Sequence, residues 1–312
     1  MSRYHSYVRM LVIAACLAFG TKPDARAQHA APSQGSNDIQ AELGQFGDIA
    51  LYVFDGRADF LARIDETLGL GNIKDPETTF AKLPRSPFTI TGRQYGKALA
   101  TCQIFVPANL TPLLDQEIFA QLMRGWFGQQ LSYATSVDMT YRWLIYHEVR
   151  HCQPDHFGGT DTENHMDERD ADLFAFDKLS TKANRNALAT DILAFRMITS
   201  ALFADRAHMT GLSIKRGLAP QSDQEAINTE QEIAAFLATR RLVTAHAKAI
   251  AAKATPTNLE LIRAITELRE RSVAGTIKTD NPLISEILID LDDAVAHFAP
   301  KLHASVATRR SN

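Results

Sequence analysis

One five-residue stretch, HEVRH at His147–His151, constrains this chain more than any other. It lies in a segment that we interpret as a helix. On an α-helix, residues four apart lie on the same face, so two imidazoles with this spacing can reach one metal ion. Glu148 lies at the edge of that face, where a carboxylate can hold a metal-bound water and accept its proton. The order and spacing therefore predict a metal-binding helix with His147 and His151 as ligands and Glu148 as general base.

A pair of carboxylates follows on the next predicted helix. Glu168 and Asp172 are four residues apart, so they share one helix face. Glu168 can complete a zinc site of two histidines and one glutamate. Asp172 can accept the free ring N–H of a ligating histidine and so fix its tautomer. Several neighbours compete for the role of third ligand: Glu163, His165, Asp167 and Asp170.

The two motifs together resemble those of the gluzincin metallopeptidases, which include the thermolysin-like and prenyl-protein endopeptidase families. These families place a His-Glu-x-x-His helix before a helix with the third ligand in Glu-x-x-x-Asp. The second family commonly shows Glu-x-x-Ala-Asp, as Glu168 to Asp172 does. The resemblance covers residues 137–180. The longer metzincin motif is not met, because Pro154 and Phe157 stand where that motif requires Gly and His.

The resemblance implies a Zn²⁺ cofactor, a peptide or protein substrate and a zincin-like α+β fold. In such folds the upstream strand nearest the cleft commonly binds extended substrate by backbone pairing. Residues 99–106 form the predicted strand that would take this role. Stabilising the oxyanion needs one more donor. His208, Tyr133, His165 and Arg150 are candidates that the sequence does not separate, and we take His208 forward.

Two other functions stay open. One is a zinc hydrolase that acts on a non-peptide amide. The other is a non-catalytic helical binding protein of the cell envelope, whose metal site is degenerate or structural. A structural zinc site is closed by four protein ligands, so a fourth ligand such as His156 or His165 would favour the binding protein.

The N-terminal segment predicts export. An apolar run at residues 10–20 follows two arginines, and Ala25-Arg26-Ala27 provides an A-x-A cleavage site, so residues 1–27 are typical of a signal peptide. The alternative is a lipobox ending at Cys16, whose cysteine would carry a lipid anchor. The run is too short to span a bilayer. Either alternative predicts a periplasmic or secreted protein without a membrane span.

Export also changes what the cysteines predict. Cys102 and Cys152 remain as a pair in an oxidising compartment. Cys102 lies in a predicted strand and Cys152 directly follows His151. A disulfide between them would fix that strand to the end of the metal-binding helix. The alternative is two buried free thiols, because cysteine packs well as a small apolar residue.

Composition bounds the size and the partners of the fold. The 312 residues are 45% hydrophobic and 22% charged, enough for one substantial core or two modest ones. The net charge of −3 gives no footprint for nucleic acid. The order of predicted strands, metal-binding helix and glutamate helix, together with the resemblance, implies a helix-rich α+β fold, a zincin-like domain with a small N-terminal β-sheet followed by C-terminal helices.

The predicted organisation follows shifts in composition along the chain. We expect a signal peptide at 1–27, a flexible leader at 28–47, a zincin-like metallopeptidase domain at 48–212, a C-terminal helical region at 213–301 and a disordered tail at 302–312. Within it we expect strands at 48–54, 88–91 and 99–106, a helix at 113–123 and a loop at 211–223. The stretch Thr229–Glu232 has the pattern of a capping box at the start of a helix.

Overall fold

The structure is a computed structural model. It describes residues 34–54, 56–67, 69–72, 88–90, 93–94, 97–98, 102–107, 132–153, 161–202, 205–219, 227–252, 256–277 and 281–308. The predicted signal peptide, Cys16, the expected helix at 113–123 and His156 lie outside the described residues. Among the described residues, no helix is both long enough and apolar enough to cross a membrane.

The chain forms two compact units, which the predicted boundary at residue 212 does not separate. One unit consists of Met1–Ile118 with Leu144–His156, and the other of Phe119–Trp143 with Phe157–Asn312. The region around residue 212 lies inside the second unit, because Gly211–Leu218 is a helix, α9, that packs on its neighbours α7 and α8. The chain is helix-rich with a small sheet, as the composition and motifs predict.

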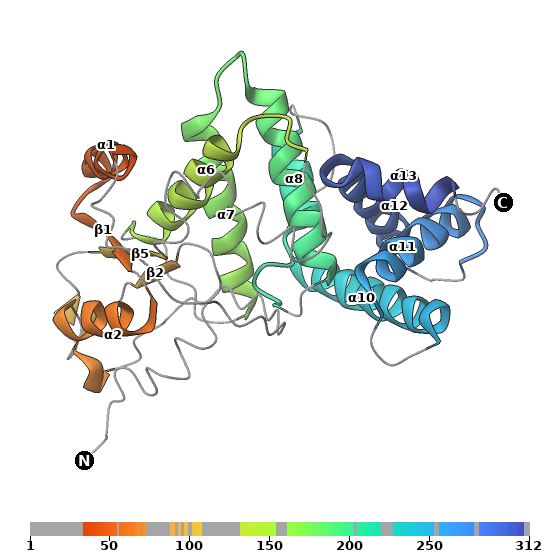
Figure 1. Cartoon of the computed structure of the whole chain (residues 1–312), viewed down its shortest axis with the longest axis horizontal. Helices are drawn as coiled ribbons and strands as arrows, with labels where there is room; N and C mark the ends of the chain where they lie inside the picture. Colours follow the sequence, from red (N-terminus) through yellow and green to blue (C-terminus); the bar gives the residue numbers. More distant parts are fainter. Residues whose placement is uncertain are drawn as a thin grey trace. The chain divides into compact units, whose positions relative to one another are not determined.

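The first unit is built on a three-stranded sheet in the order β1-β5-β2 (Figure 1). β1 (Ile49–Phe54) pairs in parallel with β5 (Cys102–Pro107), and β2 (Phe88–Ile90) pairs antiparallel on the other side of β5. The short strands β3 (Arg93–Gln94) and β4 (Lys97–Ala98) form a separate pair. Helix α2 (Gly56–Thr67) follows β1, and its buried Phe60 contacts Phe54 and Phe105 with ring centroids 5.3 and 6.4 Å away. The 3-10 turns are Gly44–Phe46 and Leu70–Asn72.

The strand predicted to bind substrate, residues 99–106, does not have the edge that this role needs. Its described part, β5, is the central strand, and β1 and β2 pair with its two sides. Over Gln103–Phe105 both sides are occupied at once, so the backbone of β5 has no position there for an added strand. The prediction is wrong for these residues.

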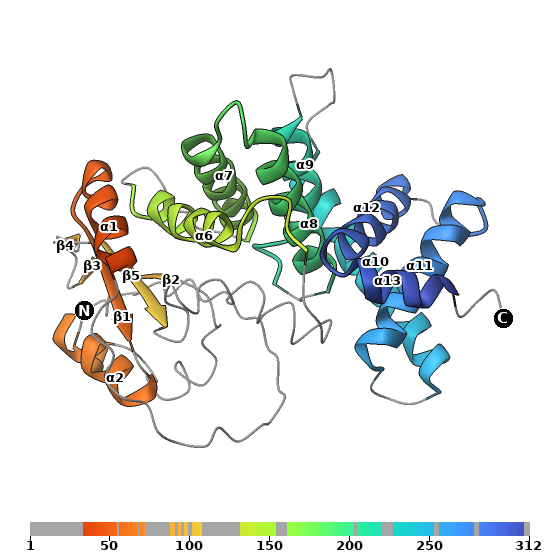
Figure 2. The ribbon, with the colours of Figure 1, turned by 45° about the horizontal axis from the view of Figure 1, so that its top comes forward.

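The predicted flexible leader at 28–47 is also wrong for its second part. Residues Gln34–Leu43 form helix α1, beside β1 in Figures 1 and 2. Ile39 and Leu43 are buried, which gives this short helix an apolar face to pack. The side-chain amide of Gln40 donates to the carbonyl oxygen of Ile49 (3.0 Å) and accepts the N–H of Leu51 (2.8 Å). Gln40 thus pairs with the outer edge of β1 as a neighbouring strand would.

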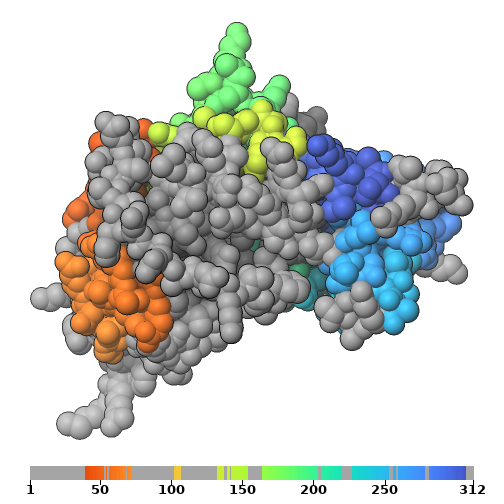
Figure 3. All heavy atoms as spheres, viewed as in Figure 1, coloured from red at the N-terminus to blue at the C-terminus, as the bar shows by residue number. Residues whose placement is uncertain are grey.

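The described residues of the second unit are mainly helical. Its helices are α7 (Asp161–Leu179), α8 (Arg185–Leu202), α9, α10 (Thr229–Ala251), α11 (Asn258–Val273), α12 (Pro282–Phe298) and α13 (Pro300–Thr308). α12 packs against α8, α10, α11 and α13, and its buried face includes Ile287, Leu288 and Leu291. Figure 2 shows these helices side by side, and Figure 3 shows α10 to α13, in light to dark blue, as one continuous surface.

Three local predictions in this unit are corrected by tertiary contacts. The expected loop at 211–223 begins with helix α9, and the expected disordered tail at 302–312 is helical to Thr308, where Val306 is 3% exposed. The expected capping box at Thr229–Glu232 is not formed. Asn228 caps α10 by accepting the N–H of Gln231 (3.2 Å), while Glu232 accepts backbone N–H groups of α9.

Candidate metal centre

The helix predicted to bind metal is α6 (Val137–His151). Ser136 caps its N-terminus, as expected, because its hydroxyl accepts the N–H of Met139 at 3.1 Å. At the other end, Cys152 is joined to Cys102 of β5 by a disulfide with a Cα–Cα distance of 5.5 Å. This covalent bond attaches the end of α6, next to His151, to the central strand of the first unit.

The two predicted histidine ligands lie close together on α6. Their Nε2 atoms are 3.2 Å apart, and His147 and His151 are 1% and 4% exposed. Two imidazole nitrogens approach this closely either when one donates its proton to the other or when both lone pairs face a cation. Two nitrogens bound to one tetrahedral Zn²⁺ at about 2.0–2.1 Å would lie roughly 3.3 Å apart. The spacing of the two rings therefore fits a shared metal ion.

Glu148, the predicted general base, is also buried, with 3% of its surface exposed. It follows His147 directly on α6, and Val149 after it is fully buried. A carboxylate beside two imidazoles that can bind Zn²⁺ fits the predicted role of general base.

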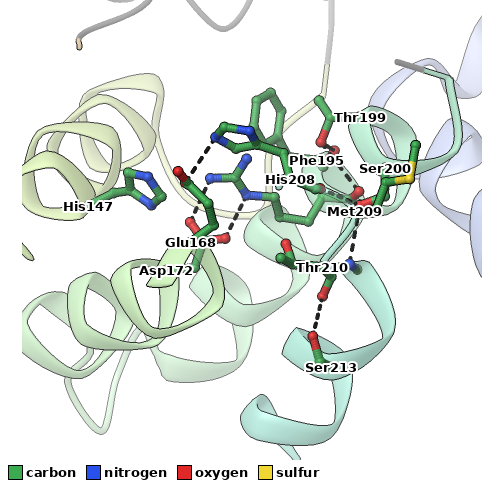
Figure 4. A network of polar contacts seen from close by, with 12 residues as sticks. His147, Glu168, Asp172, Phe195, Thr199, Ser200, His208, Met209, Thr210 and Ser213 are labelled. Carbon is green, nitrogen blue, oxygen red and sulfur yellow. Dashed lines mark hydrogen bonds and ion pairs between the residues drawn. The ribbon is translucent and has the colours of Figure 1, made fainter. Parts of the chain in front are cut away.

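The predicted third ligand, Glu168, lies on α7 in the second unit and is fully buried. Its Oε2 is 2.9 Å from Nε2 of His208, toward which it points in Figure 4. Nδ1 of His208 lies 2.9 Å from Asp205 Oδ2. Burial alone would lower the pKa of His208, but the carboxylates of Glu168 and Asp205 outweigh it and raise that pKa from 6.5 to about 10.

Asp172 lies one turn after Glu168 and is fully buried as well. The guanidinium of Arg196 on α8 holds both of its oxygens, with Nε 2.6 Å from Oδ2 and Nη2 2.7 Å from Oδ1. The same guanidinium lies 5.2 Å from the centroid of the Trp143 ring, on the part of α6 that belongs to the second unit. Arg196 therefore connects α8 with α7 through Asp172 and with α6 through Trp143.

The other candidates from the sequence have different surroundings. Nε2 of His165 lies 2.9 Å from the carbonyl oxygen of Met209, and the ring of Tyr133 packs edge-on against Phe298 with centroids 5.6 Å apart. Asp170 is half-buried and pairs with Arg169 at 2.7 Å. Asp167 and Arg150 are half-buried, and the side chain of Glu163 lies outside the described residues.

Sequence reasoning did not identify Arg196 and Asp205 as parts of this arrangement. The signal for Arg196 was available: a cation inside an otherwise apolar helix must have a buried partner. Asp205 carries no such signal, because it lies in a polar turn between α8 and α9.

The predicted site residues are thus divided between the two units. His147, Glu148 and His151 belong to the first, and Glu168, Asp172 and His208 belong to the second. A comparison with known proteins finds no matching family model, no matching curated protein and no matching solved structure.

Proposed function

We propose that this protein is an exported zinc-dependent metallopeptidase with a zincin-like fold. In this proposal His147, His151 and Glu168 hold one Zn²⁺, and Glu148 is the general base. The observation that carries the proposal is the 3.2 Å separation of the Nε2 atoms of His147 and His151, both of which are buried on α6. Chance pairs of surface histidines are solvated and need not converge in this way.

When bound, Zn²⁺ supplies Lewis acidity that polarises a peptide carbonyl and lowers the pKa of water. Residues of the chain transfer the proton and hold the metal. The carboxylate of Glu148 takes the proton of the attacking water and returns it to the leaving nitrogen. His147 and His151 bind as neutral imidazoles, so the site loses its ligands when they are protonated.

His208 is the proposed donor to the oxyanion. Asp205 lies against Nδ1 of the His208 ring, so the Nε2–H of that ring can donate a hydrogen bond to another acceptor. In the structure Glu168 faces that atom. In the proposed reaction the carbonyl oxygen of the substrate accepts a hydrogen bond from this N–H instead, and the charge that stays on the imidazolium stabilises the developing oxyanion.

A second candidate function is favoured by the same 2.9 Å contact between His208 and Glu168. If His208 binds the metal together with His147 and Glu168, and His151 completes the set, four protein ligands close the site. The protein would then be a non-catalytic envelope protein with a structural metal. The variant His208→Ala separates the two functions. If His208 is the catalytic donor, the variant loses hydrolysis but retains zinc. If His208 is a metal ligand, the variant loses zinc.

The experiment that tests the proposed function replaces Glu148 by Gln and measures peptide hydrolysis and zinc content in parallel. The substitution removes the base but keeps size and hydrogen bonding, so we expect hydrolysis to disappear while about one zinc per chain stays bound. Glu230→Gln, at an exposed glutamate of α10, is the matched control and should behave as the native protein does. Full activity in Glu148→Gln would contradict the assigned mechanism.

A further inference from the structure

The turn that carries His208 is held by buried polar side chains that the proposed chemistry does not use. The hydroxyl of Ser200 on α8 donates to the carbonyl oxygen of His208 (2.9 Å) and accepts the N–H of Gly211 (3.2 Å). Figure 4 shows Ser200 beside this turn. The next carbonyl along the chain, that of Met209, lies 2.9 Å from Nε2 of His165. The carbonyl groups of His208 and Met209 are therefore held by side chains of two different helices, α8 and α7.

His165 lies three residues before Glu168, on the same face of α7. The two side chains contact consecutive residues of the turn: Glu168 contacts the ring of His208, and His165 contacts the backbone of Met209. A carbonyl oxygen only accepts, so Nε2 of His165 carries the proton and donates it. Among the residues that the structure describes, Nδ1 of His165 has no hydrogen-bond partner. The ring is 1% exposed, so its orientation depends on the Nε2 side.

Glu232 on α10 supports the same arrangement. One of its oxygens accepts the N–H groups of Leu212 and Ser213, each at 2.9 Å, and so caps α9 directly after the turn. Its other oxygen is 3.4 Å from Nε2 of His165. Glu232 and His165 are both buried, so α7, α10 and the start of α9 meet at one polar cluster in an apolar surrounding.

We propose that His165 is a positioning residue for His208. By holding the Met209 carbonyl, it sets where the ring of His208 lies relative to Glu168 on the same helix. The catalytic part of this inference rests on the proposed function, in which His208 is the oxyanion donor. A displacement of about 1 Å in such a donor can lower the rate on the order of a hundredfold, so a residue without contact to substrate can still control turnover.

The kinetic test is a double-mutant cycle in zinc-loaded protein. We expect His165→Leu to lower kcat by roughly ten- to a hundredfold, with KM and zinc content unchanged. His165→Gln should recover most of the loss, because its amide can donate to the same carbonyl. In a His208→Ala background, His165→Leu should cause no further loss. An equal fold-loss in both backgrounds would show that His165 has only a structural role.

A second readout does not depend on turnover. In histidine-labelled protein after chelation, the ring N–H signals of His208 are assigned by their loss in His208→Ala. We expect these signals to move in His165→Leu and to return in His165→Gln. Ser200→Ala, which removes the neighbouring hydrogen bond, should move them too, and it takes the place of His165→Leu if that variant does not fold. His246→Gln, at a half-buried histidine paired with Glu267, is the control.

The two readouts separate the two hypotheses. If the native protein hydrolyses no peptide, the proposed function fails and the ring signals still decide whether His165 positions His208. If hydrolysis is normal but the His208 signals are the same in native protein and in every His165 and Ser200 variant, the positioning role is refuted while the proposed function stands.

Discussion

Arg196 and Asp172 form a fully buried, two-point ion pair, with N–O distances of 2.6 and 2.7 Å and exposures of 1% and 0%. Asp172 is the carboxylate expected to orient a ligating histidine, a role that stays a prediction. Its two oxygens face a guanidinium in a low-dielectric surrounding, where a charge left alone is far more costly than a charge at the surface. The pair therefore joins α7 and α8 at the helix turn next to Glu168.

Replacing Arg196 by Met should accordingly destabilise the protein by about 3–5 kcal/mol, because Asp172 would be left as a buried charge. Urea unfolding measures this difference. Arg169→Met is the matched control: Arg169 pairs with Asp170 at 2.7 Å, but the side chains are 31% and 44% exposed. Its loss should change the stability by at most about 1 kcal/mol. Equal effects of the two substitutions would contradict the account of the buried pair.

Asp191 predicts how stability depends on pH. It accepts the N–H groups of Ala134 and Thr135 (2.8 Å each) and faces Nε2 of His297 at 2.7 Å. Burial would raise the pKa of Asp191, but His297 and the hydrogen bonds outweigh it and hold that pKa below 3.8. A lowered carboxyl pKa stabilises the fold above the unfolded value of 3.8, and this stabilisation is lost as the pH falls through the folded value.

The stability advantage of the native protein over Asp191→Asn should therefore shrink as the pH falls below about 3.8. Chemical unfolding at a series of pH values measures it. Asp177→Asn, at an exposed position of α7, is the control for the substitution itself. A gap between native protein and Asp191→Asn that stays constant to low pH would refute the assignment.

Gln40 predicts a specific weakness at the edge of the sheet. Gln40→Ala removes two hydrogen bonds to the outer edge of β1 and leaves that edge open, so we expect a loss of roughly 1–3 kcal/mol and a greater tendency to aggregate. Gln45→Ala is the control, because the Gln45 side chain donates to Glu42 at an exposed position. Unfolding curves and light scattering report both effects. If the two variants behave identically, Gln40 does not protect the outer edge of β1.

The disulfide between Cys102 and Cys152 closes a loop with a sequence separation of 50. The loss of loop entropy in the unfolded chain predicts a stabilisation of about 4 kcal/mol. Cys102→Ser with Cys152→Ser should show that loss in urea unfolding. In a Cys16→Ser background, unfolded and unreduced protein should contain no free thiol. Two free thiols per chain would show that the cysteines are not bonded.

The sequence predicts the parts of this fold that depend on local spacing. α6 with its Ser136 cap, β1 and the helix that starts at Pro282 depend on capping residues and apolar periodicity, which are local. α9 and α13 were missed because tertiary contacts stabilise them: Glu232 caps α9 from 20 residues away, and α13 is short but buries Val306. Short helices of this kind are marginal on their own.

The candidate site divides in the same way. The spacing of His147, Glu148 and His151 is a property of one helix and is visible in the sequence. The partners of Asp172 and His208 are not, because Arg196 and Glu168 are 24 and 40 residues away and reach them only through the packing of α7 and α8.

Metal content tests the central claim most directly. Elemental analysis of the purified native protein, beside His147→Ala and Glu168→Ala, should find about one zinc per chain in the native protein and almost none in either variant. Loss in both variants would show that His147 and Glu168 belong to one metal site. No zinc in the native protein after incubation with the metal, or zinc retained in both variants, would contradict the proposed centre.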